Sequence, residues 1–189
     1  YVAVVRAANI TVDGLAGDWS GVSKAGTDDD EDVLDGYDIG DFYFTESDNG
    51  ATFYMRFDVY SDTLVIERGA QIVTYFDIDQ DPATGQSQNN FFGNFGADAY
   101  ASFYKTLGGA NYREVGIWNG MDWDIVGLPT TLRTAYAGNT FELGVAYAAL
   151  GIDSTDCFSV GIHFENYSDS PDDNVLGEHC DTPTGVNLS

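Results

Sequence analysis

Apolar and polar residues alternate with a period of two along most of the chain, in runs that Gly, Asn and Asp separate. Such alternation is typical of β-strands with one buried face, and helical periodicity is nearly absent. The pattern predicts strands at 41–46, 51–60, 71–78, 97–107, 112–118, 122–126, 132–137, 140–145 and 157–166, with one helical turn at 146–150. Many short strands at this spacing predict an all-β fold, a jelly-roll-like antiparallel β-sandwich in one domain.

The clearest local feature is a hairpin over Asn49-Gly50, since this dipeptide is a strong signal for a tight turn between strands. The strand after the turn places Phe53, Met55 and Phe57 on one face. A second hairpin is predicted over Gly138-Asn139.

The chain divides into an N-terminal strand at 1–9, a sandwich domain at 10–180 and a tail at 181–189. Val2, Val4 and Val5 make the first segment apolar on both faces, which suits a strand buried between sheets. Supplied to the open sheet edge of the next copy, it would join copies by donor-strand complementation. The alternative is that it folds back onto its own sheet.

Charge narrows the choice of partners. The 31 acidic residues against 7 basic ones give a net charge of −24, which excludes nucleic acid and anionic membrane surfaces as partners. No apolar run is long enough for a membrane helix, so membrane insertion is not expected. The acidic residues are 24 Asp and 7 Glu, and the aspartates cluster, which favours bound divalent cations over an evenly acidic halophilic surface, although both can hold.

Asp77, Asp79 and Asp81 form the best candidate metal site, because alternate residues leaving a strand can turn several carboxylates toward one calcium ion. The segment is not an EF-hand, since Pro82 and Gln88 stand where that loop needs Gly and Glu. A second candidate calcium cluster contains Asp28, Asp30 and Asp32. The alternatives are a solvated acidic turn for the first cluster and a disordered acidic loop for the second.

Cys157 and Cys180 predict a disulfide in a secreted chain, with two buried free thiols as the alternative. We therefore expect an extracellular or cell-surface protein. Three short sequons are candidate glycosylation sites, at Asn9, Asn166 and Asn187.

The segment Ile10-Thr11-Val12-Asp13-Gly14, followed by Asp18-Trp19, resembles the opening of DOMON-like and family 9 carbohydrate-binding-module-like β-sandwiches. Segments 53–60, 75–79, 84–85, 96–100, 141–143 and 149–151 fit the same pattern, so the resemblance spans about residues 10 to 165. It implies a jelly-roll-like sandwich whose relatives include sugar binders and haem binders. It also implies that Asp98 completes the metal site around Asp77.

An enzyme is not expected, because the chain has no nucleophile elbow, no zinc-type His spacing and no phosphate-binding glycine loop. Trp118 and Trp123 flank the Asn119-Gly120 turn, with Tyr112 on the same strand face as Trp118. These rings would stack on sugars if exposed, and the alternative is that both tryptophans cap the core.

Phe91, Phe92 and Phe95 lie in an Asn/Gly-rich segment and predict an unusual apolar exposure or contact surface. Two functions follow from these features. The main hypothesis is a self-assembling structural subunit of a filament, sheath or surface layer, whose partners are other copies of itself. The alternative is a carbohydrate-binding module that binds glycans.

Overall fold

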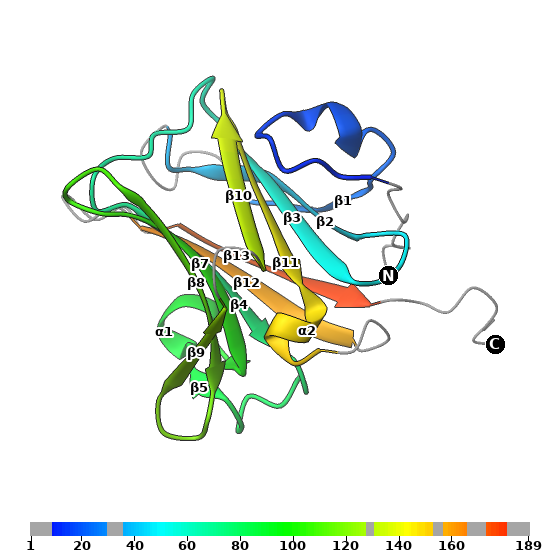
Figure 1. The fold of residues 1–189 in the computed structure, drawn as a ribbon, viewed down its shortest axis with the longest axis vertical. Coiled ribbons are helices and arrows are strands. Elements are labelled where there is room, and N and C mark those ends of the chain that lie inside the picture. The colour runs from blue at the N-terminus through cyan, green and yellow to red at the C-terminus, as the bar shows by residue number, and fades with distance from the viewer. Residues whose placement is uncertain (1–8, 30–35, 128–130, 153–156, 166–172, 181–189) are drawn as a thin grey trace.

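The computed structural model describes residues 9–29, 36–127, 131–152, 157–165 and 173–180 (Figure 1). Two antiparallel sheets face each other in these residues and enclose one hydrophobic core. This arrangement confirms the predicted class, an all-β antiparallel sandwich in a single domain.

The five-stranded sheet has the order β1-β2-β3-β11-β10. Its strands are β1 (Lys24–Thr27), β2 (Ile39–Glu46), β3 (Thr52–Val59), β11 (Thr140–Ala146) and β10 (Leu132–Ala137). The six-stranded sheet has the order β13-β12-β4-β7-β8-β9. Its strands are β13 (Asp173–Cys180), β12 (Cys157–Glu165), β4 (Gln71–Asp77), β7 (Ala99–Lys105), β8 (Asn111–Trp118) and β9 (Trp123–Gly127).

The remaining elements are short: η1 (Ala16–Trp19), β5 (Gln86–Ser87), α1 (Asn89–Phe92), β6 (Gly96–Ala97) and α2 (Tyr147–Leu150). The helix α2 is the helical turn that the sequence predicts. Among the described residues no helix has the length and apolar character that crossing a bilayer requires.

Both predicted hairpins are present, since β2 pairs with β3 and β10 pairs with β11. Besides the two-residue β5, two strands of the main sheets were missed, β1 and β13. β1 contains only four residues, and none of them is buried. In β13 the inward positions are Asp173, Val175, Gly177 and His179, so only one of the four carries an aliphatic side chain. Neither strand therefore shows the apolar alternation by which strands are recognised in a sequence.

The core is built from aromatic side chains of both sheets. Phe53, Met55 and Phe57 of β3 are fully buried, as the alternation predicts. The ring centroid of Phe53 lies 5.4 Å from that of Phe76 in β4 and 5.7 Å from that of Phe158 in β12. These edge-to-face contacts join the two sheets.

The long connection between β4 and β7 covers part of the outer face of the six-stranded sheet (Figure 1). Phe91 of α1 lies over His163 with ring centroids 4.1 Å apart, and Phe95 is buried. Phe92 packs on Gly161, where a Cβ atom would lie 2.7 Å from the ring. The expected apolar exposure of these phenylalanines is therefore wrong for Phe95, which is buried and packs against Phe92 of α1.

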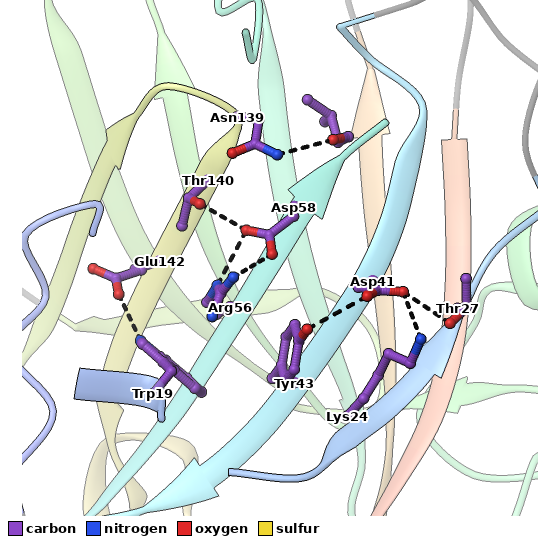
Figure 2. A network of polar contacts seen from close by, with 11 residues as sticks. Trp19, Lys24, Thr27, Asp41, Tyr43, Arg56, Asp58, Asn139, Thr140 and Glu142 are labelled. Carbon is purple, nitrogen blue, oxygen red and sulfur yellow. Dashed lines mark hydrogen bonds and ion pairs between the residues drawn. The ribbon is translucent and has the colours of Figure 1, made fainter. Parts of the chain in front are cut away.

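A buried carboxylate holds the N-terminal described segment to the outer face of the five-stranded sheet (Figure 2). Glu142 of β11 is fully buried and accepts a hydrogen bond of 2.6 Å from Trp19 Nε1. Its other oxygen accepts the backbone N–H groups of Asp13, at 2.8 Å, and of Gly14, at 2.6 Å. Three donors thus compensate the desolvation of one carboxylate.

We expect Glu142→Gln to lower the free energy of unfolding by about 1–3 kcal/mol, because an amide has one acceptor oxygen and leaves at least one of these buried donors unsatisfied. The exposed Asp48 provides the matched control, and Asp48→Asn should change stability by less than about 0.5 kcal/mol. Urea unfolding measures both. Equal midpoints for the two variants would contradict this role of Glu142.

Register brings the two cysteines to opposite positions, since Cys157 of β12 pairs with Cys180 of β13. Directly opposed residues of antiparallel strands have Cα atoms about 4.5–5.5 Å apart, which lies within the range of disulfides. The bridge itself stays a prediction. Non-reducing mass spectrometry should find the two peptides linked and two hydrogens lighter, whereas two alkylatable thiols in the unfolded, unreduced chain would refute it.

Candidate functional site

Three of the four aspartates predicted to bind calcium through one site come together at one end of the six-stranded sheet. Asp77 ends β4, Asp79 follows in the next loop, and Asp98 lies between β6 and β7. One carboxylate oxygen from each lies within 4.8 Å of the other two. Calcium binding at this trio stays a prediction.

Backbone pairing explains why residues 77 and 98 meet. The backbone N–H of Asp98 donates to the carbonyl oxygen of Phe76 at 2.8 Å, and Phe76 is also the last β4 residue paired with β7, so Asp98 lies beside the end of β4. The Asp98 carboxylate then accepts the backbone N–H of Ile78 at 2.8 Å. The connection between β4 and β7 packs closely on itself next to Asp98, because a Cβ atom on Gly96 would lie 2.2 Å from the carbonyl oxygen of Thr84.

Asp81 does not join the trio. Its exposed carboxylate accepts the backbone N–H of Ala83 at 3.0 Å, while its own N–H donates to Asp79 at 2.9 Å. The expectation that three alternate aspartates face one point holds only for extended backbone. Here Gln80 has a φ of 55°, so the chain turns between Asp79 and Asp81.

Asp77 is the most buried member of the trio, with 3% of its surface exposed. Burial raises the pKa of its carboxyl, and the charges of Asp98 and Asp79 raise it further, against N–H groups of Gly96 and Gln80 that lower it. Its Oδ1 is buried and has no hydrogen-bond partner among the described residues. The site thus concentrates negative charge around an unsatisfied oxygen.

A groove of about 530 Å³ lies on the outer face of the same six-stranded sheet, where α1 leaves it uncovered. Its lining comes from four neighbouring strands and two loop residues, and consists of Gly69, Gln71, Ser102, Tyr104, Thr106, Tyr112, Glu114 and Glu165.

Strand register sets the order of these side chains. Glu165, Gln71, Tyr104 and Tyr112 are consecutive partners across β12, β4, β7 and β8, and so form one row along the groove. Sequence reasoning identified only Tyr112 of this row. The others occupy outward positions of predicted strands, but the strand order is needed to see that they are neighbours.

The groove has a polar floor with two aromatic rings. Tyr112 exposes 53% of its surface. Beside it, the hydroxyl of Tyr100 donates a 2.7 Å hydrogen bond to Glu114. Burial, and next this hydrogen bond, raise the pKa of Tyr100, so its hydroxyl stays a donor that orients the carboxylate. Among the described residues the lining includes two carboxylates and no Lys or Arg.

Trp118 and Trp123 are direct partners in the β8–β9 hairpin, and both are half-buried. Their ring centroids lie 5.3 Å apart, and Trp123 also packs edge-on against Tyr100 at 4.8 Å. Tyr112 shares their face of the sheet but lies six residues along β8 from Trp118, about 20 Å at 3.4 Å per residue. The three rings therefore do not lie together in one platform, and stacking of a sugar on any of them stays a prediction.

The second predicted calcium cluster is described only in part. Asp30 and Asp32 lie outside the described residues, while Asp28 lies next to Asp173 of β13. Asp173 is buried and accepts the backbone N–H groups of Ile39 and Asn174. Burial raises the pKa of the Asp173 carboxyl to about 8, and Asp28 contributes to the same shift.

Some of the predicted assembly and glycosylation residues are not among those that the structure describes. Val2, Val4, Val5, Asn166 and Asn187 lie outside the described residues, so the assembly strand and two candidate glycosylation sites stay predictions. Asn9 is exposed, as a glycan acceptor must be.

Comparison with known proteins finds a solved structure of similar fold. No family model matches the chain, and no curated protein matches it. The crystal structure of a "putative carbohydrate-binding protein" from Bacteroides uniformis ATCC 8492 is similar over 96% of this chain and 90% of that chain, with a TM-score of 0.52 and 10% sequence identity. This likeness supports a β-sandwich of that kind and is not specific to the DOMON-like or family 9 groups.

We expect stability to fall as pH rises from about 5 to 8. A carboxyl whose folded pKa lies near 8 and whose unfolded pKa lies near 4 favours folding fully below pH 4, and this contribution is lost as pH rises through 8. Asp173→Asn should reduce the slope, and the exposed Asp122→Asn should leave it unchanged. Thermal melts in chelator across this range measure it, and an unaltered slope in Asp173→Asn would contradict the assignment.

Proposed function

We propose that this protein is a non-enzymatic glycan-binding β-sandwich that takes up an oligosaccharide along the groove on the outer face of the six-stranded sheet. The observation that carries the proposal is the row of Glu165, Gln71, Tyr104 and Tyr112 across four strands of that groove. The Bacteroides relative, described as a putative carbohydrate-binding protein, supports it.

The side chains of the row match the chemistry of a sugar. The exposed ring of Tyr112 offers a flat apolar surface for the C–H face of a pyranose, as aromatic rings with a polar edge do at binding sites. Gln71 and Glu114 offer acceptors and donors to the hydroxyl groups. Three strand spacings of about 4.8 Å separate β12 from β8, so the row spans about 14 Å, enough for more than one sugar ring.

The same geometry favours binding over hydrolysis. Glu114 lies in β8 and Glu165 in β12, so their strands are about 14 Å apart. The two carboxyl groups of a glycosidase lie about 5–9.5 Å apart, on either side of the scissile bond. Glu114 is in addition held by the Tyr100 hydroxyl.

Charge restricts the ligand. A groove with two carboxylates, in a chain of net charge −24, repels uronic-acid and sulfated glycans. Neutral or amino sugars therefore fit this site.

Self-assembly through the N-terminal strand remains a second prediction that no described residue bears on. It is compatible with glycan binding, because the groove lies on strands of the sandwich domain and the assembly strand lies before it.

Tyr112→Ala should weaken binding to the glycan at least tenfold, about 1.4 kcal/mol, with the melting temperature nearly unchanged. The probe is an array of neutral, amino and acidic oligosaccharides, followed by titration calorimetry with the strongest neutral or amino binder. Tyr54→Ala is the matched control, since its ring lies on the outer face of the other sheet.

Two results would contradict the proposal. One is an array on which no neutral or amino oligosaccharide binds. The other is a loss of affinity in Tyr54→Ala equal to that in Tyr112→Ala, which would place the sugar elsewhere.

A further inference from the structure

The acidic trio at the end of β4 has no cationic partner among the described residues. Its oxygens lie within 4.8 Å of one another, and none of the ion pairs between described residues includes Asp77, Asp79 or Asp98. Those ion pairs join Lys24 to Asp41, Arg56 to Asp58 and His163 to Glu165. Three like charges at this spacing repel strongly unless a cation lies between them.

The burial of Asp77 is a second observation that points to a bound cation, and it is independent of the clustering of the carboxylates. Asp77, a member of the trio, is 97% buried, and its Oδ1 has no hydrogen-bond partner among the described residues. Buried polar atoms in native proteins are almost always satisfied, and each exception calls for a ligand, an ion or water. The solvated acidic turn that the sequence left open does not account for a buried, unsatisfied carboxylate oxygen.

We propose that Asp77, Asp79 and Asp98 bind a hard divalent cation of the calcium type, and that this ion controls the packing of the Trp118–Trp123 pair. The spacing allows one ion to reach all three oxygens, since they lie within 4.8 Å of one another. Calcium takes six to eight oxygen ligands in flexible geometry, whereas magnesium demands a near-ideal octahedron and is usually bound through only one or two carboxylates, so three carboxylates favour calcium. Water completes the coordination on the exposed side, where Asp79 lies.

Asp98 connects the proposed ion site to the tryptophan pair. The carboxylate of Asp98 belongs to the trio, and its carbonyl oxygen accepts the backbone N–H of Trp118 at 2.7 Å. Trp118 in turn packs against Trp123, and Trp123 against Tyr100 beside the groove. An ion that fixes Asp98 therefore fixes the end of β8, where the tryptophan pair lies.

The same ion fastens the covering connection to the sheet. Asp79 accepts the hydroxyl of Thr84 at 2.9 Å, and Asp98 accepts the N–H of Ile78, so two ligands hold the loop from both ends. Without the ion, repulsion between the carboxylates of Asp79 and Asp98 weakens the attachment of this connection to the sheet.

Tryptophan fluorescence isolates this site from other acidic clusters that bind ions weakly. The protein, freed of metal by chelator, is titrated with calcium alone and separately with magnesium, with no sugar present. Two of the three tryptophans belong to the pair, and the third, Trp19, is buried against Glu142 on the opposite sheet. We expect a saturable emission change with calcium and at least a tenfold weaker response to magnesium.

Variants give the matched comparison. Asp77→Asn and Asp98→Asn should weaken the calcium response at least tenfold, whereas Asp81→Asn, whose carboxylate lies outside the trio, should stay within about twofold of the wild type. Asp77→Asn should also melt higher than the wild type in chelator, because it removes a repelling buried charge, and lower than the wild type in calcium.

A variant that melts higher than the wild type in chelator but lower in calcium indicates an ion site. If Asp77 had only a structural role, Asp77→Asn would melt lower than the wild type in both conditions. The proposal is overturned if calcium leaves the emission unchanged, if Asp77→Asn responds as the wild type does, or if Asp81→Asn loses the response equally. Because no sugar is used, failure of glycan binding leaves the result intact.

Discussion

The rest of the structure depends on the aromatic contact between the two sheets, centred on Phe53. Its ring lies within 5.7 Å, centroid to centroid, of Phe44 in its own sheet and of Phe76 and Phe158 in the other. Large rings remove much apolar surface from water and fix the spacing of the layers. Because this contact holds the six-stranded sheet from its inner face, the outer face is free to carry the groove and the acidic trio.

The outer faces of the two sheets differ in how their buried carboxylates Glu142 and Asp77 are satisfied. On the five-stranded sheet, Glu142 meets three donors, so the N-terminal described segment is held by satisfied hydrogen bonds. On the six-stranded sheet, one oxygen of Asp77 has no hydrogen-bond partner among the described residues. The first arrangement is complete within the described residues, whereas the second is the basis of the proposed ion site.

One connection, between β4 and β7, places both features of the outer face. Its α1 buries Phe95 and covers His163, which leaves the groove as the uncovered remainder of the sheet. Its ends carry Asp79 and Asp98. Sugar binding and ion binding would therefore share one structural element while using different side chains.

The sequence by itself determined the fold class, both hairpins, the turn α2 and the inward face of β3, because alternation and turn residues are local properties. It also brought Asp77 and Asp79 into the candidate site, since a strand that ends in acidic residues is visible along the chain. Only the tertiary structure decided the rest. Strand order aligned Gln71 with Tyr104 and Tyr112, and a turn at Gln80 removed Asp81 from the trio. Such positions follow from pairing between strands distant in sequence, which no local pattern encodes.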